Sequence, residues 1–89
     1  MSITDKPTLT VAKNGTRSWR LNGKLHRTDG PADEDADGST EWWLRGNRHR
    51  IDGPAVEYTD GSTEWWLNGE KVDAIVHFLK VGKLSVDKS

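Results

Sequence analysis

Short runs of alternating apolar and polar side chains fill most of the chain, and residue pairs that end in glycine separate them. Such alternation predicts half-buried β-strands, and Asn-Gly or Asp-Gly between two runs predicts a tight type I′ hairpin turn. Arg45-Gly46 is an exception, because arginine tolerates a positive φ poorly, and there we expect a type I turn with a glycine bulge. The type I′ turns are expected at Asn14-Gly15, Asn22-Gly23, Asp37-Gly38, Asp60-Gly61 and Asn68-Gly69.

The pattern repeats along the chain. Residues 37–46 read Asp-Gly-Ser-Thr-Glu-Trp-Trp-Leu-Arg-Gly, nearly the same residues return 23 positions later at 60–69, and a fainter copy lies at 14–23. A period of this length indicates stacked structural repeats. Pro31 and Pro54 cannot donate to a sheet ladder, so they mark wider connections between hairpins. The predicted fold class is an all-β repeat, an antiparallel meander of β-hairpins in three 23-residue units, with six to seven strands and one short C-terminal α-helix.

The pattern changes close to the C-terminus. Asp73 is a suitable helix N-cap, Ile75, Phe78 and Leu79 then fall on one helical face, and Gly82 is a plausible stop. We expect the three apolar side chains to pack on the sheet. The predicted single domain, 1–89, comprises a tail (1–8), three hairpin repeats (9–30, 31–53 and 54–73), the helix (74–82) and a second tail (83–89).

Two-residue turns would fix the strand register, and with it the face on which each side chain lies. In that register Trp19, Trp42 and Trp65 belong to a buried face, while Trp43 and Trp66 point outward and are expected to be largely exposed. For the third unit, the buried face is expected to hold Val56, Tyr58, Trp65, Leu67 and Val72, and the outer face Glu57, Glu64, Trp66 and Lys71.

The outer face is expected to be rich in carboxylates. Glu57 would lie opposite Glu64, and Glu34 opposite Glu41, and like charges in facing positions destabilise a sheet. Either arginines from the neighbouring loops, Arg27 or Arg50, neutralise these glutamates, or the surface awaits a cationic partner.

Basic side chains are expected beside the outward indoles. Arg48 opposite Trp43, and Lys71 opposite Trp66, suit cation–π contacts. This pairing places positive charge next to the two indoles.

The middle unit departs from the third. Asp33 and Asp35 occupy the positions of Val56 and Tyr58, on the face expected to be apolar. Either the sheet is uncovered there and offers a second contact patch, or Arg17 and another base pair with the two aspartates.

Composition narrows the function classes. The chain carries a net charge of −1, 33% hydrophobic residues, five Trp and no cysteine, so neither a disulfide framework nor a thiolate metal site is available. Charge is unevenly spread, since residues 1–28 sum to +5 and residues 29–41 to −6. No apolar run approaches the roughly 20 residues of a membrane span. We therefore expect a cytoplasmic protein that does not enter a membrane.

Candidate catalytic groups are few. His26-Arg27 and His49-Arg50 recur at the same repeat position, where packing and loop hydrogen bonding explain them better than a metal or a general base. No nucleophile, base and acid can be assembled, and the glycines lie in hairpin turns rather than in a phosphate-binding loop. We expect no enzyme activity, no cofactor and no metal.

The runs Leu21–Ala32 and Leu44–Ala55, each followed by Asp-Gly-Ser-Thr-Glu-Trp-Trp, resemble a Trp-Trp variant of the MORN repeat. The resemblance covers about residues 9–73 and is greatest to small repeat proteins of bacteriophages and prophages. It implies hairpin repeats of about this length. It further implies a phage-encoded protein that binds and inhibits a host factor in the host cytoplasm, as anti-CRISPR and other anti-defence proteins do.

The favoured function is a non-enzymatic protein-binding module whose acidic surface occupies a basic groove of a host protein. One alternative is a structural protein that forms homo-oligomers through the Trp face or the sheet edges. Another is nucleic-acid binding, with Arg20 among the phosphate contacts, which the carboxylates disfavour. The residues expected to bind the partner are Trp43, Trp66, Glu34, Glu41, Glu57, Glu64, Arg45, Arg48, Asp33 and Asp35.

Overall fold

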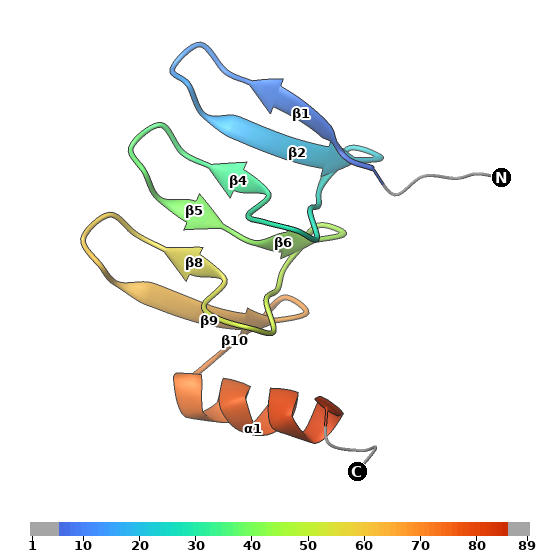
Figure 1. Cartoon of the computed structure of the whole chain (residues 1–89), viewed down its shortest axis with the longest axis vertical. Coiled ribbons are helices and arrows are strands. Elements are labelled where there is room, and N and C mark those ends of the chain that lie inside the picture. Colours follow the sequence, from blue (N-terminus) through green and yellow to red (C-terminus); the bar gives the residue numbers. More distant parts are fainter. Residues whose placement is uncertain (1–5, 86–89) are drawn as a thin grey trace, which may run out of the picture.

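The computed structural model describes residues 6–85, and of residues 83–85 only the backbone. It is a stack of antiparallel hairpins with one helix below the last of them (Figure 1), which confirms the predicted fold class. The strands are β1 (Thr8–Val11), β2 (Arg17–Leu21), β3 (Lys24–Leu25), β4 (Asp33–Glu34), β5 (Thr40–Glu41), β6 (Trp43–Leu44), β7 (Asn47–Arg48), β8 (Val56–Glu57), β9 (Thr63–Leu67) and β10 (Glu70–Val72), and the helix is α1 (Ala74–Ser85).

The main sheet runs in the order β1-β2-β4-β5-β8-β9-β10, with β3 paired to β2, and β6 and β7 form a separate pair. The described residues contain more strands than expected, because the short return segments β3, β7 and β10 are strands in their own right and β5 and β6 are separated at Trp42. The molecule measures 45 × 43 × 17 Å, so the sheet has no second layer of comparable size. Both faces are therefore within reach of solvent.

Backbone hydrogen bonds between units recur at the 23-residue period. Arg27 N–H donates to the carbonyl of Trp43, and Arg50 N–H to that of Trp66 (3.1 and 3.2 Å). One unit's return strand is thereby tied to the long strand of the next unit.

The loops at the long ends of the hairpins contain three residues rather than two. In the third unit Gly61 N–H donates to Tyr58 O and Tyr58 N–H to Ser62 O, and the same two bonds recur around Gly15 and Gly38. The glycines have positive φ, and the Asx residues before them do not, so these are type I turns with a glycine bulge. The predicted type I′ turns at Asn14-Gly15, Asp37-Gly38 and Asp60-Gly61 are therefore wrong.

The side chain before each of these glycines explains the choice of turn. Asp60 Oδ1 accepts a hydrogen bond from Ser62 N–H at 2.9 Å, and Asn14 and Asp37 accept the equivalent bond. This local bond stabilises an Asx-turn. The signal lies in the residue two places beyond the Asx as well as in the Asx-Gly pair.

The short turns are of type I′, as predicted at Asn22-Gly23 and Asn68-Gly69. Arg45-Gly46 adopts the same turn, with φ of 52° at Arg45 and 86° at Gly46, so the bulged turn expected there is wrong. Arg45 N–H donates to His26 Nδ1 at 3.0 Å, and Asn68 N–H to His49 Nδ1 at the same distance. A histidine of the preceding unit thus holds the arginine in a strained conformation.

The extra loop residue shifts the register of the long hairpins by one, which moves side chains to the opposite face. Glu57 pairs with Thr63 and Glu34 with Thr40, so the predicted Glu57–Glu64 and Glu34–Glu41 oppositions are wrong. Asp33 is the residue that faces Glu41.

The second hairpin of the third unit has the predicted register. Trp65 pairs with Val72 and Trp66 with Lys71. Val56, which pairs with Glu64, consequently shares the face of Trp66 instead of the expected face of Trp65.

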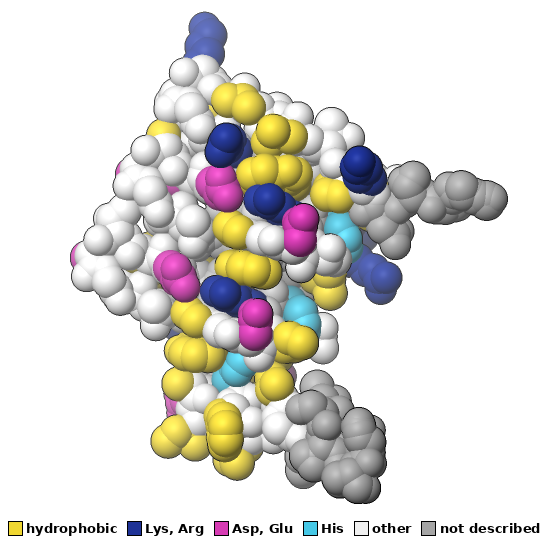
Figure 2. Space-filling view, in the orientation of Figure 1, with side chains coloured by type: hydrophobic (Ala, Val, Ile, Leu, Met, Phe, Trp, Pro, Cys, Tyr) yellow, Lys and Arg dark blue, Asp and Glu magenta, His cyan; other side chains and the backbone are white. Residues whose placement is uncertain are grey.

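Arginines cover Trp19 and Trp42, which lie on the face of the sheet opposite Trp66. The guanidinium carbon of Arg27 lies 3.8 Å from the ring centroid of Trp19, and that of Arg50 lies 4.0 Å from Trp42. Figure 2 shows this face, where basic side chains in the middle lie beside acidic ones and between hydrophobic bands. The fully buried apolar residues are small or medium in size and lie between the units, namely Ala32, Ala55 and Val56.

The helix α1 uses a different face from the one predicted. Ile75, Phe78 and Leu79 are 72%, 74% and 58% exposed, whereas His77 is buried against the ring of Trp65. The helix also continues through Gly82 to Ser85, past the predicted stop. The third unit has Asp73 where the others have arginine, so the helix supplies the ring that covers Trp65.

Candidate functional site

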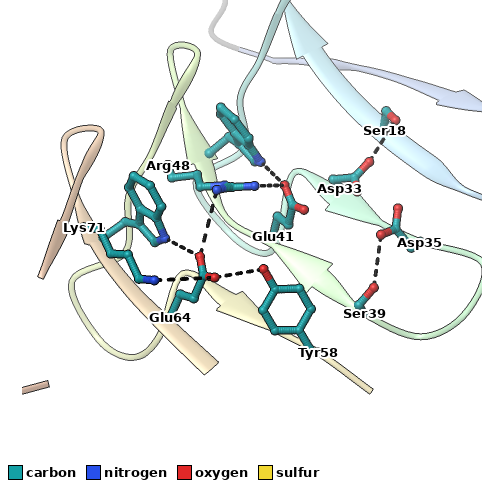
Figure 3. A network of polar contacts seen from close by, with 11 residues as sticks. Ser18, Asp33, Asp35, Ser39, Glu41, Arg48, Tyr58, Glu64 and Lys71 are labelled. Carbon is teal, nitrogen blue, oxygen red and sulfur yellow. Dashed lines mark hydrogen bonds and ion pairs between the residues drawn. The ribbon is translucent and has the colours of Figure 1, made fainter. Parts of the chain in front are cut away.

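The register places indoles and carboxylates of the second and third units on one face of the sheet, together with Ser18 of the first unit, and we call this the indole–carboxylate face. Figure 3 shows its polar contacts between β2, β4, β5, β8, β9 and the short return strands. Its members are Ser18, Asp33, Asp35, Ser39, Glu41, Trp43, Arg48, Tyr58, Glu64, Trp66 and Lys71.

Arg48 lies between the two indoles of this face. Its guanidinium carbon is 5.2 Å from the ring centroid of Trp43 and 5.0 Å from that of Trp66. Both indoles are half-buried, so the expectation that they are largely exposed is wrong. The predicted contact between Arg48 and Trp43 is confirmed, and Trp66 receives the same cation.

Each indole is oriented by the glutamate two residues before it. Trp43 Nε1 donates to Glu41 at 2.8 Å and Trp66 Nε1 to Glu64 at 2.9 Å. Arg48 is 3.5 Å from Glu41 and 4.0 Å from Glu64, so one guanidinium joins the two units. Its Nε is buried and has no hydrogen-bond partner within the described residues.

In the third unit the carboxylate is well compensated. Glu64 accepts hydrogen bonds from Trp66 and from the hydroxyl of Tyr58, and Lys71 lies 3.8 Å away (Figure 3). The hydrogen bond from Trp66, assisted by Tyr58 and the nearby cations, lowers the pKa of Glu64. The hydrogen bond that the Tyr58 hydroxyl donates to Glu64 raises the pKa of Tyr58.

The middle unit is not compensated in this way. Carboxylate oxygens of Asp33, Asp35 and Glu41 all lie within 4.8 Å of one another. Burial, followed by the neighbouring Asp35 and Glu41, raises the pKa of Asp33 to about 6. Ser18 donates to Asp33 at 3.3 Å, and the one hydroxyl proton of Ser39 is shared between Asp35 at 3.0 Å and Asp37 at 2.7 Å. We call Asp33, Asp35 and Glu41 the carboxylate cluster.

The chemistry of the carboxylate cluster is that of an acceptor for cations. Three carboxylates carry the hard oxygen ligands preferred by Ca²⁺ and Mg²⁺, and equally the acceptors of a lysine or arginine from another protein. Arg48 reaches Glu41, but Arg17, which was expected to pair with the two aspartates, pairs with Glu34 on the opposite face.

Seven of the ten predicted partner-binding residues lie together on this face. Glu34 and Glu57 do not: they face the opposite side and pair with Arg27 at 3.5 Å and Arg50 at 3.4 Å, which confirms the neutralisation by loop arginines for these two glutamates. Glu41 and Glu64 lie near Arg48 instead. Arg45 lies exposed at the tip of a turn. The residues that lie together are Trp43, Trp66, Glu41, Glu64, Arg48, Asp33 and Asp35.

Tyr58 belongs to this face, although the sequence pattern predicted it on the other one. The two-residue turn expected at Asp60-Gly61 would have placed it among buried residues on the other side. The signal was the serine after the glycine, which favours the longer loop, because Ser62 N–H bonds the side chain of Asp60.

The predicted structural role of the histidines is confirmed. His26 and His49 each accept a backbone N–H at Nδ1, which fixes the proton of the neutral ring on Nε2. Burial, with a smaller effect of His77, lowers the pKa of His49.

A hollow of about 400 Å³ lies on the opposite face, above Trp42. Arg27 and Arg50 flank it, and both are engaged with carboxylates of their own units, Asp29 and Asp52. A smaller open depression of about 230 Å³ lies on the indole–carboxylate face, lined by Trp43, Gly46, Asn47, Arg48, Trp66 and Gly69.

No known protein family, curated protein or solved structure matches the chain. The resemblance to MORN repeats and to phage proteins therefore stays a prediction. Among the described residues, α1 is the one helix, and it is too short to cross a membrane.

Proposed function

We propose that the protein is a non-enzymatic binding module whose indole–carboxylate face receives a basic segment of a protein partner. The observation that carries the proposal is the carboxylate cluster, where Asp33, Asp35 and Glu41 meet beside a half-buried indole while the equivalent position of the third unit holds Val56 and Tyr58. A charged substitution of this kind weakens the sheet. A partner that supplies positive charge would offset this cost.

The partner's basic side chains would contact the carboxylate cluster, and its apolar parts would enter the neighbouring depression between the two indoles. Charge complementarity of this kind accelerates association and selects partners. The resemblance to phage repeat proteins suggests a bacterial host factor with a basic groove, and inhibition of that factor by occupation of the groove.

Nucleic-acid binding is less well supported by the same geometry. Arg48 is committed to two indoles and two glutamates, and its surroundings carry an excess of negative charge. A phosphate backbone would meet these carboxylates first.

The test is affinity capture from a bacterial lysate with Asp33→Asn/Asp35→Asn protein beside the unmodified chain. A partner bound through the carboxylate cluster is expected to be lost in the double variant and at high salt. The matched control is Asp29→Asn/Asp52→Asn, which removes two charges from the opposite face. Capture that survives the double variant unchanged would contradict the proposal.

A further inference from the structure

Within the part of the chain that the structure describes, the first strand of the sheet has one neighbouring strand. β1 pairs with β2 and stands at the end of the strand order, and all four of its residues are exposed. Figure 1 shows it at the upper margin of the stack, with no strand of residues 6–85 beyond it. At the other end of the order α1 follows β10 and packs against β9. The two ends of the sheet are thus unequal, and the β1 edge is the open one.

The hydrogen bonds of β2 show which groups of β1 face outward. Trp19 N–H donates to Ala32 O, on the side of β2 away from β1. Leu9, which pairs with Trp19, is therefore in a non-hydrogen-bonded pair, and its own N–H and C=O point to the open edge. The same holds for Val11, two residues further along the strand.

The residues of this edge suit pairing with an identical strand. Thr8–Val11 reads Thr-Leu-Thr-Val, which carries no charge, proline or glycine, and its β-branched residues favour strand formation. Leu9 and Val11, 45% and 59% exposed, lie on one face, with Thr10 between them on the other. An antiparallel copy centred on Thr10 would set Leu9 opposite Val11 in both directions.

We propose that two copies of this chain associate through β1, in antiparallel register about Thr10, so that the sheet continues from one copy into the other. Each pair of Leu9 with Val11 of the second copy would exchange two backbone hydrogen bonds and bring two apolar side chains into contact. The area involved is small, so the dimer is weak and forms at high protein concentration.

The symmetry of this arrangement has a consequence for the indole–carboxylate face. Facing residues in an antiparallel pair project to the same side, so the two-fold axis is perpendicular to the sheet. Both copies would present their indole–carboxylate faces on one side of a continuous sheet. The dimer does not depend on the proposed function, which concerns a separate surface.

The test is sedimentation equilibrium over a wide concentration series, combined with amide hydrogen exchange. Leu9→Pro removes an outward N–H while leaving the β1–β2 hydrogen bonds in place, because proline is tolerated at an edge position that faces solvent. We expect association to fall at least tenfold, and the protection of the Val11 amide, present in the concentrated unmodified protein, to disappear.

A second variant guards against misfolding of the first. Val11→Lys places a charge on the edge and should also abolish association, whereas Ile51→Lys, an exposed apolar residue of the same kind, should not. A monomer at every concentration would overturn the proposal. So would a dimer that Leu9→Pro leaves intact, or one that is lost on Phe78→Lys in α1 and kept in both β1 variants.

Discussion

The ring of His77 lies edge-on against Trp65, with ring centroids 4.8 Å apart and an angle of 62° between the planes. In the preceding units the same position over tryptophan is taken by the guanidinium groups of Arg27 and Arg50. His77 Nε2 also donates to the carbonyl oxygen of Arg50. The helix thus closes the last unit through one side chain that replaces a repeat arginine.

Replacement of this side chain should loosen the helix. His77→Ala uncovers Trp65 and leaves the carbonyl of Arg50 without its partner, and we expect a loss of about 2 kcal/mol in the free energy of unfolding. Chemical denaturation followed by tryptophan fluorescence measures it. The control is Phe78→Ala in the same helix, where an exposed ring should cost less than about 0.5 kcal/mol. Equal losses in the two variants would show that the helix packs through its other face.

Removal of the charge between the indoles should weaken the contact between the second and third units. Arg48→Met keeps the aliphatic stem but leaves Glu41 and Glu64 without their shared cation, and we expect a loss of about 1 kcal/mol. Thermal unfolding in low salt measures it, and Arg48→Lys should recover part of the loss. Arg45→Met, at an exposed turn, is the matched control. An unchanged melting temperature for Arg48→Met would refute the bridging role.

The turn at Arg45 offers a stabilising substitution. Its φ of 52° is costly for arginine and readily adopted by asparagine, the residue at Asn22 and Asn68. Arg45→Asn is expected to raise the free energy of unfolding by about 0.5–1 kcal/mol. Asn68→Arg should lower it by a similar amount. The denaturant midpoints of the two variants test this prediction. Shifts of the same sign in both variants would contradict it, because relief of φ strain and its introduction must change stability in opposite directions.

The carboxylate cluster should make stability depend on pH. The pKa of Asp33 is raised to about 6 from its ordinary value of 3.8, so the folded state binds more protons than the unfolded state between these values. Its contribution is complete below about pH 4 and is lost as pH rises through about 6. After allowance for solvent screening we expect about 1 kcal/mol.

Asp33→Asn isolates this contribution from that of His49, which acts in the opposite direction. The lowered pKa of His49 gives stability that is complete above about pH 6.5 and declines below it. The quantity to measure is therefore the difference in unfolding free energy between Asp33→Asn and the unmodified chain, at pH 4 and at pH 7. A more favourable difference at pH 7 is expected, and a constant difference would contradict the shifted pKa.

The sequence was sufficient wherever one local rule decides the structure. The 23-residue period gave the hairpin stack, Asp73 gave the helix start, and the Asn68-Gly69 turn gave the correct pairing of Trp66 with Lys71. It was insufficient where two local solutions compete. Asp60-Gly61 fits a loop of two residues or of three, and the bond from Ser62 selects the longer one, which reverses the face of Tyr58.

Other differences arose from residues distant in the sequence. Arg45 takes a positive φ with its N–H bonded to His26, which lies 19 residues away. The exposure of Trp43 and Trp66 could not be predicted either, because it depends on how one guanidinium, that of Arg48, lies between two units. Such contacts are set by tertiary packing, which a residue pattern alone does not contain.

The recurrence of the same hydrogen bonds between successive units makes the chain extensible. Arg27 to Trp43 and Arg50 to Trp66 are the same link in two places, so the middle unit meets its neighbours through surfaces that match each other. In a one-dimensional array of this kind, stability is a sum over units and their junctions. Insertion of a second copy of residues 31–53 would therefore lengthen the array by one junction and leave both ends unaltered.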